Sequence, residues 1–239
     1  TLLYTKWQTF TGGLAIYSLI YRKKPAPVRK SSNPLLELSA TSLAKRIREG
    51  QISSEAVVEA YIERIKEVNS YVNAVVEERF NAALVDAKEC DIKLKNGEVN
   101  ATMLEQEKPL YGVPFTVKES CGIKGLSQTG CTIPRRGMKA PEDGQAVQIL
   151  KNAGAIPLCV TNTSELCSAF NTTNPLFGST NNPYDRRVTV GGSSGCVIRS
   201  RCFSTRNRFR LGWFCKNTSS LQWCIRPQTH YRFLIYVFL

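Results

Sequence analysis

Charge is divided unevenly along this chain. Residues 1–195 hold 24 Lys/Arg and all 19 Asp/Glu, a net charge of +5, whereas residues 196–239 hold 8 Lys/Arg and no acidic residue. The last acidic residue is Asp185, and the tail after residue 195 also carries four of nine cysteines and the only histidine. With 42% hydrophobic residues overall, the first part is typical of a globular domain and the tail is not. We therefore expect the folded domain to end near residue 195.

Residues 1–34 are predicted to form a hydrophobic arm and a linker ahead of the domain, which then spans residues 35–195. Phe10 to Tyr21 is largely apolar, but it is shorter than the roughly 20 residues that cross a bilayer. A basic flank and a proline-marked linker follow, with Arg22, Lys23, Lys24, Arg29 and Lys30 as the cations and Pro25, Pro27 and Pro34 as the prolines. This order favours membrane association on the intracellular side. The alternative is an arm that packs on the globular body.

Hydrophobic periodicity predicts helices alternating with strands in residues 35–195. Helices are expected from a cap at Thr41 or Ser42 to Gly50, from Ser53 to about residue 68, and over 77–95 and 146–153; strands are expected over 72–76, 109–117 and 156–161. This alternation predicts a layered α/β architecture.

The cysteines and the histidine predict neither a metal site nor a disulfide framework. Five cysteines are scattered through the domain without a CxxC pair, at Cys90, Cys121, Cys131, Cys159 and Cys167, and the total of nine is odd. Free thiols in a reducing compartment are favoured over disulfides. A single histidine makes a zinc site improbable.

Two segments carry residue types suited to catalysis. Lys118 ends the apolar run Gly112–Val117, and burial there would favour the neutral amine that can accept a proton. The second segment is Gly191-Gly192-Ser193-Ser194-Gly195, whose glycines allow the backbone to approach a substrate closely. Considered separately, Lys118 is equally well explained as an ordinary lysine at the end of a strand. The glycine–serine segment is equally well explained as a flexible loop.

These two segments belong to an ordered series. The series runs Gly112-Val113-Pro114-Phe115 and Lys118, Lys151-Asn152-Ala153-Gly154-Ala155-Ile156, Thr161-Asn162 with Ser164-Glu165, Asn181-Asn182-Pro183-Tyr184-Asp185, and the glycine–serine loop. It resembles the amidase signature family, in particular the fatty-acid amide hydrolase 2 branch, from about Asn33 through Gly195.

The resemblance implies an α/β fold with a mixed sheet flanked by helices, of which this chain holds the N-terminal portion. It implies a serine hydrolase without cofactor or metal, in which Lys118 is the base and Ser193, in a cis peptide, relays a proton to a second, nucleophilic serine. Gly191, Gly192 and Gly195 suit that strained peptide, and Ser194 would position the backbone. The implied substrate is a lipid, a fatty-acid amide. A soluble amidase, an amidotransferase amidase subunit and a non-catalytic truncated product remain as alternatives.

After Gly195 the chain departs from the family pattern, and no nucleophile is identifiable. The family continues with a small-residue helix and a Gly-Gly-Ser segment, but Cys196 begins an unrelated sequence here. With permitted codons, Phe209–Thr218 read one base later encodes Ser-Asp-Leu-Gly-Gly-Ser-Val-Arg-Ile-Pro, which is similar to the missing segment. Trp213 has a single codon, so its junction with Phe214 fixes one of these glycines. We therefore interpret residues 196–239 as a frameshifted tail.

The same interpretation excludes a nucleic-acid partner. The arginines and aromatic residues of the tail imitate a basic, aromatic binding patch, but a shifted frame produces such a composition without selection for any ligand. The sequence does not indicate an oligomeric state.

Overall fold

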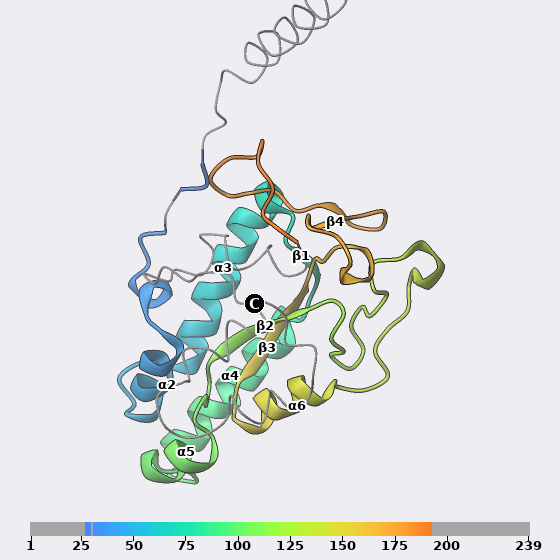
Figure 1. The fold of residues 1–239 in the computed structure, drawn as a ribbon. Coiled ribbons are helices and arrows are strands. Elements are labelled where there is room, and N and C mark those ends of the chain that lie inside the picture. The colour runs from blue at the N-terminus through green and yellow to red at the C-terminus, as the bar shows by residue number, and fades with distance from the viewer. Residues whose placement is uncertain (1–26, 30, 193–239) are drawn as a thin grey trace, which may run out of the picture.

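The computed structural model describes residues 27–29 and 31–192, in which a small mixed sheet is covered by helices (Figure 1). The helices are α2 (Ala40–Arg48), α3 (Ser54–Val72), α4 (Phe80–Lys95), α5 (Ala101–Glu107) and α6 (Gln145–Asn152), with short 3-10 turns η1 (Pro34–Glu37), η2 (Ile133–Arg135) and η3 (Glu165–Cys167). The strands are β1 (Val75–Glu78), β2 (Pro114–Lys118), β3 (Ile156–Thr161), β4 (Thr173–Asn174) and β5 (Gly178–Ser179).

The main sheet has the order β1-β3-β2, with β3 antiparallel to β1 and parallel to β2. All six residues of β3 are buried, which is why its sequence is continuously apolar up to Thr161 rather than alternating. A second, two-stranded sheet pairs β4 with β5. The predicted α/β fold with a mixed sheet and flanking helices is therefore confirmed for the described residues.

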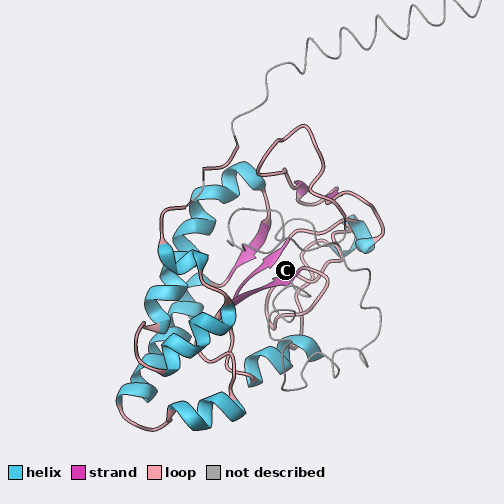
Figure 2. Ribbon diagram, turned by 60° about the vertical axis from the view of Figure 1, so that its left-hand side comes forward, coloured by secondary structure: helices cyan, strands magenta, loops and turns pink. Residues whose placement is uncertain are grey.

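Two hydrophobic clusters lie on opposite faces of the sheet. Helices α2 to α5 cover one face, to which β3 contributes Ile156 and Leu158 (Figure 2). Helix α6 packs on the other face, where Val160 of β3 meets Phe115 and Val117 of β2. The pairing of β2 with β3 shifts between Phe115 and Thr116, where Leu158 is the extra residue of β3, so Ile156, Leu158 and Cys159 belong to one cluster and Val160 to the other.

The ends of the helices and strands differ in places from the sequence-based expectation. Helix α2 is capped by Ser39, whose hydroxyl accepts a hydrogen bond from the Ser42 amide, so the predicted caps Thr41 and Ser42 were wrong. The expected Ser53 cap of α3 is confirmed. Strand β1 begins three residues later than expected because Asn73 ends α3 in the left-handed conformation, with φ of 54°.

Other boundaries also shift, while β3 keeps its predicted bounds of 156–161. Helix α4 begins at Phe80 instead of residue 77, and β2 begins at Pro114 because the residues before it form turns. Helix α5 was not predicted; its polar sequence buries only Leu104.

Part of the predicted linker is attached to the domain. The Val28 amide donates to the Pro183 carbonyl at 2.7 Å, and the Arg64 guanidinium of α3 donates to the Arg29 carbonyl at 2.5 Å. Within residues 27–29 and 31–192, no helix has the length and apolar content that a membrane crossing demands. The predicted apolar arm, residues 10–21, lies outside the described residues.

Candidate functional site

The parallel strands β2 and β3 bring Lys118 and a run of buried polar residues to one edge of the sheet. Lys118 is the last residue of β2, half-buried, and in register with Thr161 at the end of β3. The next residues of the β3 chain, Asn162, Thr163 and Ser164, are at most 1% exposed. The carboxyl ends of parallel strands are where open α/β sheets bind ligands. The predicted base therefore lies at the edge where a reaction site is expected.

Glu119 follows Lys118 directly, and its carboxylate is completely buried. Its amide donates to the Thr161 carbonyl at 2.9 Å, which continues the β2–β3 pairing by one residue. The carboxylate oxygen Oε1 accepts hydrogen bonds from the Ser127 hydroxyl at 2.9 Å and from both the amide and the hydroxyl of Thr129 at 2.5 Å. The Cys131 thiol donates to Oε2 at 3.7 Å. A buried charge is thus satisfied by one loop, and the loop is held against the sheet.

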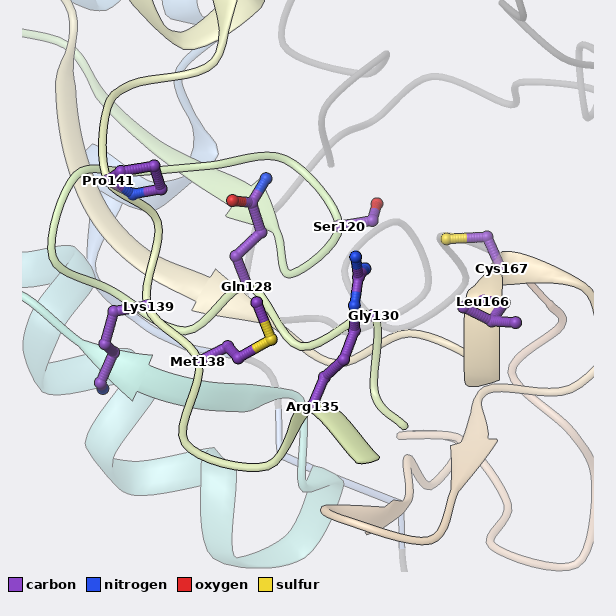
Figure 3. A pocket seen from close by; sticks show the side chains of 9 residues that line it. All are labelled: Ser120, Gln128, Gly130, Arg135, Met138, Lys139, Pro141, Leu166 and Cys167. Carbon is purple, nitrogen blue, oxygen red and sulfur yellow. The ribbon is translucent and has the colours of Figure 1, made fainter. Parts of the chain in front are cut away.

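A cavity of about 350 Å³ opens beside this edge, between the loop 120–141 and η3 (Figure 3). Its lining residues are Ser120, Gln128, Gly130, Arg135, Met138, Lys139, Pro141, Leu166 and Cys167. Ser120 is two residues beyond Lys118, so the cavity lies next to the predicted base. Leu166 closes one side, and its amide donates to the Gly130 carbonyl at 2.9 Å.

The Cys167 thiol lines the cavity and also interacts with Lys118. Burial is the largest influence on it and acts to raise its pKa, but the hydroxyls of Ser120 and Thr163 and the Lys118 ammonium together lower the pKa below its ordinary value. Neighbouring Cys121 differs, because burial outweighs the same lysine and serine and raises the pKa of its thiol. The pKa values of the two thiols therefore shift in opposite directions from the ordinary thiol value.

The glycine loop packs on the segment that follows η3. The Thr172 hydroxyl donates to the Gly191 carbonyl at 2.8 Å, and Gly192 packs on the loop after η3. A Cβ on Gly192 would lie 2.1 Å from the Ala169 carbonyl oxygen, so only glycine fits. The structure thus brings the predicted positions Gly191 and Gly192 against the segment that begins with Cys167. Ser193, Ser194 and Gly195 lie outside the described residues, as does the whole tail 196–239.

Three buried asparagines, of which Asn162 and Asn182 belong to the ordered motifs and Asn174 does not, fix the loops around the site. Asn174 donates to the Asn162 side-chain oxygen at 2.6 Å and to the Thr163 carbonyl at 2.7 Å, and Asn162 donates to the Thr180 hydroxyl at 3.0 Å. Asn182 donates to the Thr189 carbonyl at 3.1 Å, two residues before Gly191. These buried amides are therefore structural, and they hold the chain on its way to the glycine loop.

The sequence reasoning missed three features of the site. Glu119, Cys167 and Arg135 were not singled out, although an acidic residue directly after an apolar strand is a signal for a buried carboxylate. The contacts of Cys167 and Arg135 come from loops that meet only in three dimensions. No sequence spacing indicates them.

Comparison with known proteins gives consistent matches. A family model described as Amidase matches residues 56–196. Fatty-acid amide hydrolase 2-B of Danio rerio is 46% identical over 184 residues, which are 76% of this chain and 35% of that protein. Fatty-acid amide hydrolase 2 of Homo sapiens is 43% identical over 183 residues, 75% of this chain and 34% of that protein. The chain thus spans about a third of the length of these curated relatives.

A solved structure agrees in fold. A protein described as fatty acid amide hydrolase superposes with a TM-score of 0.62 at 27% identity, over 68% of this chain and 27% of that one.

The different surroundings of the two cysteines predict different pH profiles of alkylation. Because the thiolate is the nucleophile, the rate of Cys167 alkylation by iodoacetamide should rise with pH through a midpoint below 9.0, the ordinary thiol value, and that of Cys121 through a midpoint above it. Replacement Lys118→Met removes a cation, so the Cys167 midpoint should move upward. Peptide mass spectrometry across pH measures both. Equal midpoints for the two cysteines would contradict this account of the site.

Proposed function

The chain belongs to the amidase family, and we propose that it carries the proton-transfer part of an amidase that hydrolyses fatty-acid amides. Two observations support the proposal: Lys118, the last residue of β2, interacts with Cys167 of η3, and the Gly191–Gly192 loop packs on the segment directly after η3, where the Thr172 hydroxyl donates to the Gly191 carbonyl. The identity to fatty-acid amide hydrolases supports the substrate class.

In the proposed reaction, the neutral amine of Lys118 accepts a proton from the Ser193 hydroxyl. Ser193 in turn takes the proton of a nucleophilic serine, whose oxygen attacks the amide carbonyl. The C–N bond then breaks, the amine leaves with a proton returned through the same relay, and water hydrolyses the acyl-enzyme. The position of Lys118 at the carboxyl end of β2, in register with Thr161 and next to the buried polar residues Asn162 to Ser164, supports this assignment.

In this proposal, the 239-residue chain lacks the nucleophilic serine. Residues 196–239 contain no acidic residue and no Gly-Gly-Ser segment, so we infer that they form a frameshifted tail after a domain of residues 35–195. Without the nucleophile and its oxyanion donors, most of the rate of a hydrolase is lost. We therefore propose that the 239-residue chain is a non-catalytic product of an amidase gene.

We predict no turnover of a long-chain acyl amide by the 239-residue chain. A fluorophosphonate probe, which labels activated serines, should also fail to label it. Reading the gene one base later after Gly195, through the hidden Gly-Gly-Ser segment and on to a chain of the length of the relatives, should restore both labelling and turnover. Turnover by the original chain that is abolished by replacing a single tail serine would overturn the inference.

The restored protein also provides the test of the two predicted catalytic residues. Lys118→Ala and Ser193→Ala should each lower kcat by roughly 100-fold or more with an unchanged circular-dichroism spectrum. Lys124→Ala, which alters an exposed lysine on the following loop, is the matched control and should leave kcat unchanged. If either site variant kept the parent rate, its assigned role would be wrong.

We also propose that the arm of residues 1–34 brings the enzyme to a membrane surface, where apolar substrates concentrate. Its apolar run and basic flank support this proposal. Full-length chain should sediment with vesicles containing anionic lipid, and a chain lacking residues 1–26 should not. Replacing Arg22, Lys23 and Lys24 by glutamine should weaken sedimentation. Recovery of the full-length chain in the supernatant would favour the alternative of a soluble amidase.

A further inference from the structure

The cavity beside Lys118 carries an excess of positive charge. Its lining contains two cations, Arg135 and Lys139, and no acidic residue. Lys139 is neutralised, because its ammonium lies 2.5 Å from a carboxylate oxygen of Glu77 on β1. Arg135 forms no ion pair with any residue in the described ranges 27–29 and 31–192. One guanidinium is thus available to a ligand in the cavity.

The local fold aims this side chain into the cavity. Arg135 ends the 3-10 turn η2, which is fixed at its start by a hydrogen bond from the Thr132 hydroxyl to the Thr129 carbonyl at 3.0 Å. Thr129 is itself held by Glu119. The guanidinium extends over Gly130, where the position of a Cβ would be 4.0 Å from Nη1 (Figure 3). The buried Glu119 carboxylate therefore fixes, through Thr129 and η2, the position of the exposed Arg135 guanidinium at the cavity.

The remaining lining suits a small organic anion. The side-chain amide of Gln128 and the hydroxyl of Ser120 are hydrogen-bond donors on the same cavity, and Met138 and Leu166 are apolar. A guanidinium binds a carboxylate through two parallel hydrogen bonds, a geometry that a lysine does not offer. A volume of about 350 Å³ accommodates a group of amino-acid size.

We propose that this cavity is a subsite for a carboxylate on the amine half of the substrate, with Arg135 as its anion-binding residue. The substrate class is then N-acyl amino acids, whose scissile amide would lie toward Lys118 and whose carboxylate would lie against Arg135. This inference rests on the proposed amidase function, since the subsite serves a reaction only beside the base. Arg135 sets specificity and takes no part in the proton transfer.

Binding to the 239-residue chain tests the subsite without requiring turnover. Two probes share an acyl chain: hexanoylglycine carries the carboxylate, and hexanamide lacks it. The chain should bind hexanoylglycine more tightly, and Arg135→Gln should weaken that binding about tenfold, the loss expected for a charge-assisted hydrogen-bonded pair, while leaving hexanamide unchanged. The matched control is Arg136→Gln, which changes the adjacent exposed arginine that does not line the cavity, and it should change neither affinity.

The outcomes separate the subsite from the proposed function. Equal affinities for the two probes, or an Arg135→Gln chain that keeps the preference, would overturn the subsite and leave amide binding intact. If a chain that unfolds in a cooperative thermal transition bound neither probe, both the subsite and the proposed amidase function would be overturned. Should Arg135→Gln not fold, Arg135→Lys retains the charge but not the two-pronged geometry, and it should still lower the affinity for hexanoylglycine several-fold.

Discussion

The buried carboxylate of Glu119 is the interaction on which the arrangement of the site depends. The residues from 119 to 144 contain only the short turn η2 as a named helix or strand, and backbone hydrogen bonds within the loop pair residues 125–128 with 138–140. The donors that converge on Glu119 hold this loop to the sheet edge, and on its outer side the Ser127 amide donates to Glu77 at 2.7 Å. An isolated buried charge is costly, so the loop and the carboxylate stabilise each other.

The proposed base and the buried carboxylate lie at the same edge of the sheet, at the end of β2. Lys118 and Glu119 are neighbours in the chain: the half-buried Lys118 ends β2, and the completely buried Glu119 begins the turn that follows. One can therefore serve as the proposed base while the other anchors the loop that forms the cavity wall. The altered thiol of Cys167 lies at this junction and reports on the lysine, because the Lys118 ammonium is among the groups that lower its pKa.

The sequence predicts the sheet and helices better than it predicts the site. Strand β3 and helix α3 follow from continuous burial and from a regular apolar face, both of which are local patterns. Lys118, Gly191 and Gly192 could be singled out because an ordered series of motifs surrounds them. The roles of Glu119, Cys167 and Arg135 could not be predicted, since each depends on contacts between segments 8 to 49 residues apart that only the folded loops create.

The most direct test of this account is the free energy of unfolding of the Glu119→Gln chain, measured by urea denaturation together with the reactivity of Cys131. Glutamine keeps the shape but replaces charge-assisted hydrogen bonds with neutral ones and places an amide donor beside others, so the free energy of unfolding should fall by about 1–3 kcal/mol. Cys131, completely buried in the parent, should become reactive toward a thiol reagent before global unfolding, whereas the exposed control Glu142→Gln should change neither property. Parental stability and a protected Cys131 in Glu119→Gln would contradict the claim that this carboxylate organises the site.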